Sequence, residues 1–324
     1  MKALSFMVIF VFLISGCQTE IKNSDAKIEE EEGTKVAQSE PHKESKSQEL
    51  PNNNTPQEVS KNTALLGFWV GYFEKDSDDY EKDIYVDEGY FWQRENKINI
   101  SIDKIMDSLV VGHSVVAGND RPFKGTVKKK NKTYSFQVKE PGDHKYDGEF
   151  SFSIHEGQLI GKWTAYRDID IKKRKYKLEK KDFEYNPNIQ LEQSKEYVNW
   201  NKVITTKKEV EFEENEFEEW VSKEFASATN LIYTINASNT LLTKSEVENL
   251  KKGDLTIIRN TIYARHGYSF KNRPLRVFFD AQSWYIPVHT NIKDDFTALE
   301  KKNIQLLLRY EKNASEYYDF FGRG

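Results

Sequence analysis

The sequence contains a single cysteine, Cys17, among 324 residues. One thiol excludes a disulfide within the chain and leaves no cysteine cluster that could hold zinc. The sequence also lacks a His-Glu-x-x-His motif, and its six histidines are scattered along the chain. These absences predict no disulfide framework, no metal site and no bound cofactor.

The sequence also lacks an apolar run long enough to span a bilayer. The run at residues 3–15 is shorter than the roughly 20 residues that a membrane-spanning helix needs. It follows the basic residue Lys2 and ends in small residues, which is the order typical of a signal peptide. We therefore expect export and removal of residues 1–16. An ordinary secretory peptide that happens to end near a cysteine is the alternative.

The residues at the end of this run, Ile14-Ser15-Gly16-Cys17, resemble the lipobox of bacterial lipoproteins. The resemblance implies that Cys17 is lipidated after export, and two or more acyl chains give a stable membrane anchor. Gln18 follows where enteric bacteria use Asp to retain lipoproteins in the inner membrane. The resemblance thus implies a lipid-anchored protein on the extracytoplasmic side, with the outer membrane favoured in a cell that has two membranes.

Residues 17–64 are rich in Glu, Lys, Ser, Asn and Gln and contain few large apolar side chains. Such a segment cannot bury enough surface to offset its ordering entropy. We predict a disordered tether with a root-mean-square reach of roughly 35 to 40 Å. The acidic run at residues 29–32 leaves open a surface-export signal or a docking site.

Residues 65–185 alternate between apolar and polar side chains over short stretches, as in 98–102, 134–138 and 150–154. This period is typical of strands with one buried face. Turn-forming residues recur between the stretches, for example at 118–120. The pattern predicts about eight strands in an antiparallel β-barrel or sandwich, as the N-terminal domain of an α+β protein.

The start of this region, Gly67-Phe68-Trp69, resembles the Gly-x-Trp pattern of lipocalin-like barrels. The resemblance implies that the domain binds or senses a small apolar ligand. Aromatic side chains suit either the lining of a ligand cavity or a packed core. The candidates are Trp69, Phe73, Tyr90, Phe91, Trp92 and Trp163.

Residues 186–239 form a predicted connecting region. Apolar residues recur at helical spacing over 214–228, which predicts an amphipathic helix. Seven glutamates lie between Glu209 and Glu219. We interpret them as a solvated face.

Residues 240–315 predict a small, mainly α-helical C-terminal domain. Thr243 and Glu246 have the spacing of a capping box at the start of one helix. Gly253 and Asp254 would end that helix and begin the next, and Gly267 would end the second in a left-handed cap. Two further helices are expected near residues 274–279 and 296–310.

The second of these helices ends in the motif Tyr263-Ala264-Arg265-His266-Gly267. Together with Arg259-Asn260, Phe270 and Trp284-Tyr285-Ile286-Pro287, it resembles the YARHG domain. The resemblance implies a small exported module of bacterial envelope proteins. It implies no activity, because none is assigned to that family.

The interval 259–279 contains five arginines and lysines and no acidic residue, although the whole chain has a formal charge of −4. Arginine forks suit carboxylates and phosphates, but Arg259 and Arg265 could equally pair internally, with Asp254, Asp280 or the acidic segment 209–219. His266 is a candidate for acid–base chemistry, because histidine is the side chain type suited to it, and its alternative is a structural role at the helix end. The candidate binding residues are Arg259, Tyr263, Arg265, His266, Arg273, Trp284 and Tyr285.

We predict no catalytic residue, because the C-terminal segment offers no cysteine and no motif-borne serine as a nucleophile. The expected function is non-enzymatic binding of an envelope component, either an anionic glycan or a protein. Binding of a small apolar ligand by the β-domain is the alternative, and an envelope hydrolase that uses His266 with carboxylates is a third. Nucleic acid is not an expected partner of an exported, acidic chain.

Overall fold

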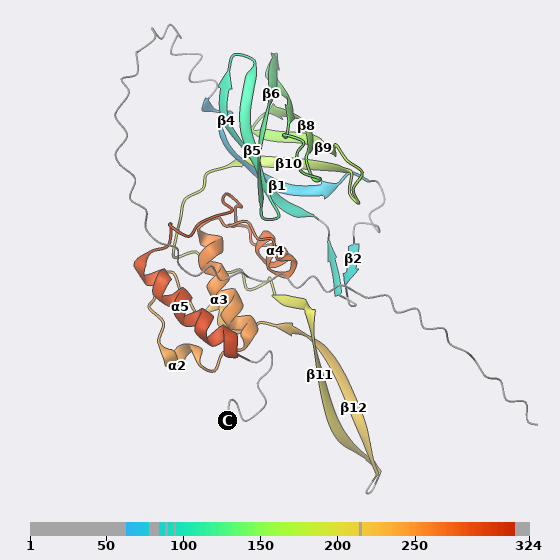
Figure 1. The fold of residues 1–324 in the computed structure, drawn as a ribbon, viewed down its shortest axis with the longest axis vertical. Helices are drawn as coiled ribbons and strands as arrows, with labels where there is room; N and C mark the ends of the chain where they lie inside the picture. Colours follow the sequence, from blue (N-terminus) through green and yellow to red (C-terminus); the bar gives the residue numbers. More distant parts are fainter. Residues whose placement is uncertain (1–62, 78–83, 88–89, 94, 214–215, 315–324) are drawn as a thin grey trace, which may run out of the picture. The chain divides into compact units, whose positions relative to one another are not determined.

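The computed structural model of the protein describes residues 63–77, 84–87, 90–93, 95–213 and 216–314 (Figure 1). The predicted signal peptide 1–16, the lipid acceptor Cys17 and the tether up to residue 62 lie outside these residues. Within them, none of the helices combines the length and the apolar character needed to cross a bilayer.

The N-terminal domain is a closed antiparallel β-barrel of eight strands, in the order β1-β10-β9-β8-β7-β6-β5-β4 (Figure 1). Strand β4 pairs with β1 and so closes the barrel. The predicted antiparallel barrel is therefore confirmed. Its strands are β1 (Gly67–Lys75), β4 (Asn96–Met106), β5 (Leu109–Val116), β6 (Asn119–Lys130), β7 (Thr133–Lys139), β8 (Gly148–His155), β9 (Gln158–Ala165) and β10 (Lys173–Lys181).

The interior of the barrel differs between its two ends. Inward-facing residues such as Ile102 and Leu178 pack one end with apolar side chains. Trp69 belongs to this core, and its indole N–H donates to the Leu65 carbonyl at 2.9 Å. Toward the other end the inward row becomes polar, because Arg121 continues the face of Phe123 along β6. The barrel is thus packed at one end and polar at the other.

The β5–β6 turn joins the barrel to the C-terminal helical region. Gly118 in this turn has φ +72°, a conformation that favours glycine. A Cβ at Gly118 would lie 2.9 Å from the backbone nitrogen of Lys271, so a larger residue would push the two segments apart. The Gly118 N–H donates to the Ser269 hydroxyl at 2.9 Å. A glycine is therefore required here both by the turn and by the close approach.

The prediction of an amphipathic helix over 214–228 is wrong for the residues of this segment that the structure describes. Strand β12 (Glu216–Ser227) pairs antiparallel with β11 (Val198–Glu213) in a two-stranded hairpin. Phe217 and Trp220 of the supposed apolar stripe are 61% and 64% exposed, so their helical spacing marks no buried face. The β-branched residues of β11 favour a strand, and pairing with it overrides the local period. A second hairpin consists of β2 (Ile84–Asp87) and β3 (Tyr90–Gln93).

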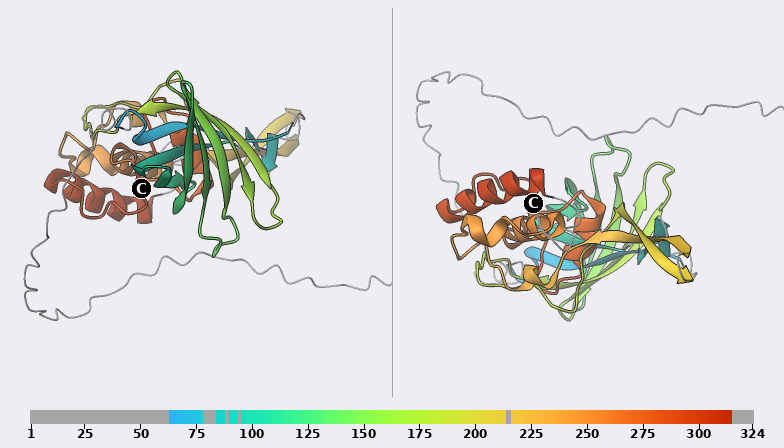
Figure 2. Two further views of the ribbon diagram at one scale, coloured as in Figure 1. Left: turned by 90° about the horizontal axis from the view of Figure 1, so that it is seen from above. Right: turned by 90° about the horizontal axis from the view of Figure 1, so that it is seen from below.

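The C-terminal region is the predicted small helical unit. It contains the 3₁₀ helix η2 (Asn230–Tyr233) and the helices α2 (Lys244–Val247), α3 (Lys252–Arg265), α4 (Arg273–Asp280) and α5 (Ala298–Asn313). Helices α3 and α5 lie side by side (Figures 1 and 2) and share a buried core that includes Leu255, Ile262 and Leu307.

Two of the predicted helix ends are confirmed, and the third is wrong. The Thr243–Glu246 capping box is present, and Gly267 has the expected positive φ of +70°. Gly253, however, lies in the first turn of α3 rather than at the end of α2. A Cβ at Gly253 would come within 2.3 Å of the Ser227 carbonyl oxygen, so β12 and α3 approach closely there. Gly253 therefore allows the close approach of β12 and α3, and it does not end a helix.

The end of α4 packs against the outer side of β4 through buried polar groups. The Lys97 backbone N–H donates to the Asp280 carboxylate at 2.8 Å. The Lys97 ammonium donates to the carbonyls of Gln282 at 2.6 Å and Tyr285 at 3.1 Å. Burial lowers the pKa of Lys97 and raises the pKa of Asp280. The Tyr72 hydroxyl adds a bond to the Asp280 carbonyl at 3.0 Å.

We expect Lys97→Met to lower the free energy of unfolding by about 3 kcal/mol, because two carbonyls and one carboxylate lose a buried cation. Lys104→Met is the matched control, since Lys104 lies on the same strand and is exposed. Denaturant unfolding of both variants measures the difference. Equal stability of the two variants would contradict the role of Lys97.

Candidate functional site

The polar end of the barrel contains a cavity of about 360 Å³ that α4 also lines. This volume falls within the usual range of small-molecule sites, about 300 to 1,000 Å³. The side chains that carry its chemistry are Phe73, Ser114, Val116, Arg121, Glu140, Tyr146, Phe150, Trp163, Asp170, Arg174, Arg273 and Arg276. We call this cavity the barrel mouth.

Aromatic rings form one wall of the barrel mouth. The Phe73 ring lies 5.6 Å from Trp163 and 6.3 Å from Phe150, measured between centroids. Two of the aromatic residues proposed from the sequence, Phe73 and Trp163, therefore line a cavity. Such a wall offers a large apolar contact area.

The other proposed aromatic residues have different positions. Trp69 lies in the packed core of the barrel. Tyr90 stacks on Trp200 with centroids 4.7 Å apart, and both residues lie outside the barrel strands. The side chains of Phe91 and Trp92 are outside the part of the molecule that the structure describes.

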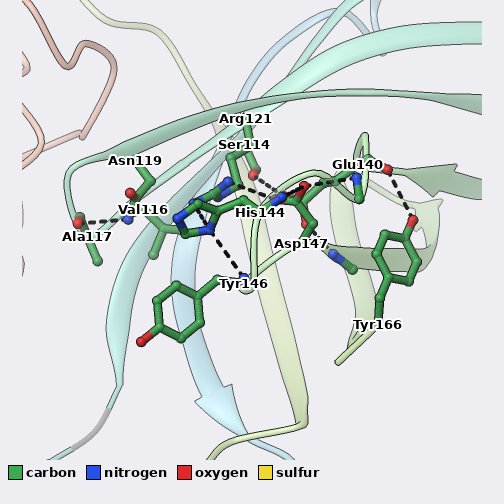
Figure 3. Close-up of polar contacts among 12 residues, drawn as sticks. Ser114, Val116, Ala117, Asn119, Arg121, Glu140, His144, Tyr146, Asp147 and Tyr166 are labelled. Atoms are coloured by element: carbon green, nitrogen blue, oxygen red, sulfur yellow. Dashed lines mark hydrogen bonds and ion pairs between the residues drawn. The ribbon is translucent and has the colours of Figure 1, made fainter. Parts of the chain in front are cut away.

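Glu140 is a buried acid within the barrel mouth (Figure 3). Its carboxylate accepts bonds from the Gly148 N–H at 2.7 Å, the Trp163 indole at 3.2 Å and the Ser114 hydroxyl at 3.2 Å. Burial raises the pKa of Glu140 to about 7, although these three bonds oppose the change. Glu140 is thus held in place and close to its titration point at neutral pH.

The loop between β7 and β8 is held at the barrel mouth by Asp147 (Figure 3). One oxygen of its carboxylate accepts from Arg121 at 2.7 Å. The other accepts the N–H groups of Gly142 at 2.9 Å and His144 at 3.1 Å. Burial would raise the pKa of Asp147, but these bonds and the Arg121 charge lower it. Asp147 thereby fixes both the loop and the Arg121 side chain.

Four guanidinium groups and two carboxylates line the barrel mouth. Arg174 lies over the Phe73 ring at 5.0 Å and donates to the Phe73 carbonyl at 2.7 Å. Arg276 comes from α4 and donates to the Lys271 carbonyl at 3.2 Å. Its Nε is buried and has no hydrogen-bond partner among the described residues. Burial also lowers the pKa of Arg276.

The end of α3 contributes a second polar cluster, inside the helical region. The His266 Nε2 lies 2.9 Å from the buried Glu300 carboxylate. The Tyr185 hydroxyl donates to the other Glu300 oxygen at 2.9 Å, and its ring stacks on His266 at 4.2 Å. Glu300 also accepts the Thr297 N–H at 3.0 Å as part of the α5 capping box.

The ionisation of this cluster is governed by Glu300. Burial would raise the pKa of Glu300, but the bonds from His266 and from the Thr297 N–H outweigh it and lower the pKa to about 2. Burial together with the Glu300 carboxylate raises the pKa of Tyr185 to about 12. A charged Glu300 thus bonds to three side chains, those of His266, Tyr185 and Thr297, and accepts the Thr297 backbone N–H.

Both arginines of α3 make internal contacts. Arg265 is buried and donates to the Ile189 carbonyl at 2.6 and 2.9 Å and to the Ser238 hydroxyl at 3.0 Å. Burial lowers the pKa of Arg265 to about 10. Arg259 makes a two-pronged ion pair with Glu311 at 2.8 and 3.0 Å. None of the acidic partners proposed from the sequence for these two arginines is the partner found.

The family model of the YARHG domain matches residues 230–312. The C-terminal helical region is a YARHG domain. The match begins before the predicted start of this domain at residue 240. No curated protein and no solved structure matches the chain significantly. YARHG domains are typically extracellular or periplasmic.

The name-giving motif of the YARHG domain lies largely in its interior. The Tyr263 ring stacks on Phe296 at 5.1 Å, and the Tyr285 hydroxyl donates to the Tyr268 carbonyl at 2.7 Å. Of the proposed binding residues, Arg273 lines the barrel mouth. Arg265 and Trp284 together line a second cavity of about 400 Å³ beside the segment 182–189.

Sequence reasoning missed most of the charged lining of the barrel mouth. Glu140 continues the inward alternation of Phe136 and Val138 one step past the end of β7, which was a usable signal. Arg276 lies in the basic interval 259–279, but nothing in the sequence separates it from its neighbours. Arg121 lies on the inward face of β6 with Phe123, but alternation alone does not show that this face lines a cavity.

We expect Glu300→Gln to lower the free energy of unfolding by about 3 kcal/mol at pH 7. The folded-state pKa of Glu300 lies below the unfolded value, so its stabilisation is complete above about pH 4.5 and is lost as the pH falls toward 2. The difference between wild type and variant should shrink over that range in denaturant titrations. The exposed Glu218→Gln is the control, and a pH-independent difference would contradict the assignment.

We expect Arg265→Met to lower the free energy of unfolding by about 2 to 4 kcal/mol, since a buried carbonyl and a buried hydroxyl lose their donor. The matched control is Arg309→Met, because Arg309 is exposed on α5. Thermal unfolding of both variants gives the comparison. An Arg265→Met protein as stable as the control would show that this arginine does not hold the domain together.

Proposed function

We propose that this protein is a lipid-anchored, extracytoplasmic binding protein without enzymatic activity, and that the barrel mouth is its ligand site. The observation that carries the proposal is a cavity of about 360 Å³ whose aromatic wall and charged groups come from the barrel and from α4 together. The lipobox resemblance of Cys17 supports the anchor. The YARHG domain supports the location.

The YARHG domain has a definite part in this proposal. Its helix α4 supplies Arg273 and Arg276 to the barrel mouth. The contact of Lys97 with Asp280 holds the end of that helix against β4. The domain thus completes the ligand site, while its motif residues Arg265 and His266 stabilise its interior. The ligand is then a small envelope component.

A non-enzymatic role is supported by the position of the titratable groups. His266 and Glu300 bond to each other, and neither lines the barrel mouth or the cavity beside residues 182–189. Within the barrel mouth, three donors occupy the Glu140 carboxylate. A general acid–base pair needs groups that reach a bound substrate.

Contact with an envelope protein is a second candidate function. The β11–β12 hairpin exposes Phe217 and Trp220 to solvent among glutamates. Exposed aromatic residues are enriched at protein interfaces. A basic partner surface would suit the acidic hairpin.

The test uses two fluorescent probes with the same aromatic body, anilinonaphthalene sulfonate and the uncharged N-phenylnaphthylamine. We expect the purified protein to bind at least one of them. Val116→Phe should weaken this binding roughly tenfold, because the added ring fills the cavity.

Val111→Phe is the matched control, since Val111 lies on the same strand and faces outward. Its probe affinity should equal that of the wild type. The proposal is wrong if neither probe binds, or if both phenylalanine variants bind as tightly as the wild type.

A further inference from the structure

We infer that the barrel mouth takes a small organic anion, whose acidic group meets Arg276 and Arg273 and whose apolar body lies against Phe73, Phe150 and Trp163. The inference rests on the proposed function, because it names the ligand class of the same site. The acidic group is a carboxylate or a phosphate, and both present oxygens that a guanidinium fork can bind.

The charge of the lining is the first argument. Four guanidinium groups line the cavity against two carboxylates, Glu140 and Asp170, while the buried Asp147 pairs with Arg121 from outside the lining, so the balance remains positive by at least one charge. The cavity walls are partly apolar, so the excess positive charge is weakly screened there. An anion therefore gains more from entering than a neutral ligand of equal shape.

The hydrogen bonding of Arg276 is the second argument. Its Nε is buried without an acceptor among the described residues. Buried donors are nearly always paired, and an unpaired one costs free energy. The Nε is closed to solvent, so an acidic group in the cavity would meet the terminal nitrogens of the guanidinium instead, and its charge would offset the desolvation that lowers the pKa of Arg276.

The position of Arg276 is fixed before a ligand arrives. Its helix α4 ends at Asp280, which accepts the Lys97 N–H and thereby fastens the helix to β4. The N-terminal end of α4 is capped by the Asn272 side chain, which accepts the Leu275 N–H at 3.2 Å. The helix is therefore held at both ends, and the guanidinium itself is bonded to the Lys271 carbonyl. A side chain held in this way loses little conformational entropy on binding.

The distribution of charge within the cavity gives the ligand a direction. Glu140 lies beside Trp163, and its charged form would repel an acidic group placed against the aromatic wall. Arg174 already lies over the Phe73 ring, so a cationic body would meet a like charge there. The acidic group therefore points toward α4, and the uncharged body contacts the aromatic rings.

The experiment compares the affinities of anilinonaphthalene sulfonate and N-phenylnaphthylamine, which differ only by the anionic group. We expect the wild type to prefer the anionic probe roughly tenfold. Arg276→Met should abolish the preference and leave binding of the neutral probe unchanged. Arg309→Met, an exposed arginine on α5, should keep the preference.

A second variant protects the test against misfolding. If Arg276→Met lowers the melting temperature, Arg273→Met replaces it, because Arg273 is exposed and lines the same cavity. Decanoate and decyl phosphate should each displace the anionic probe better than decanol. Tighter binding of decanoate would identify the acidic group as a carboxylate, and tighter binding of decyl phosphate would identify it as a phosphate.

The two proposals fail in different ways. Equal affinity for both probes, lost in Val116→Phe, would overturn the anion inference and retain the barrel mouth as a ligand site. A preference for the anionic probe that survives both arginine variants would also overturn the inference. Absence of binding by either probe would overturn the inference together with the proposed function.

Discussion

Lys97 and Asp280 meet where β4 of the barrel contacts the end of α4, and the arrangement of the barrel mouth depends on this contact. Burying both groups costs solvation free energy, which hydrogen bonds must offset. The Lys97 N–H and ammonium reach Asp280 and two carbonyls, so both residues are bonded. Because α4 is fastened in this way, its two arginines lie at the barrel mouth rather than on a free surface.

The YARHG motif follows the same principle of buried, fully bonded polar groups. Arg265 binds a carbonyl and a hydroxyl, and His266 binds Glu300. A partly bonded network of this kind would destabilise the domain, whereas a complete one specifies a single packing. The motif therefore explains how the domain holds its shape. The residues of α4 that line the barrel mouth lie outside the motif.

The sequence supports some predictions far better than others. Strict alternation predicted the strands of the barrel, because the inward face of every strand must be apolar where the barrel is packed, but it left barrel and sandwich open. Capping residues located α2, since Thr243 and Glu246 act within one helical turn. The β11–β12 hairpin was missed because the apolar residues of β12 have helical spacing, and its pairing with β11 overrides this local period. Gly253 was misread because its neighbour Ser227 is distant in sequence.

The sequence by itself determined an antiparallel domain of about eight strands, the helical C-terminal domain and the family of that domain. These depend on short-range periodicity and on a contiguous motif, whereas the pairing of β4 with β1 decided for a closed barrel over a sandwich. Only the tertiary structure decided that Arg265 and His266 are internal and that Glu140, Arg174 and Arg276 share one cavity. The three cavity residues come from separate parts of the barrel and from α4. They converge because the barrel closes and because the buried Lys97 holds α4 against the barrel. No local pattern encodes that convergence.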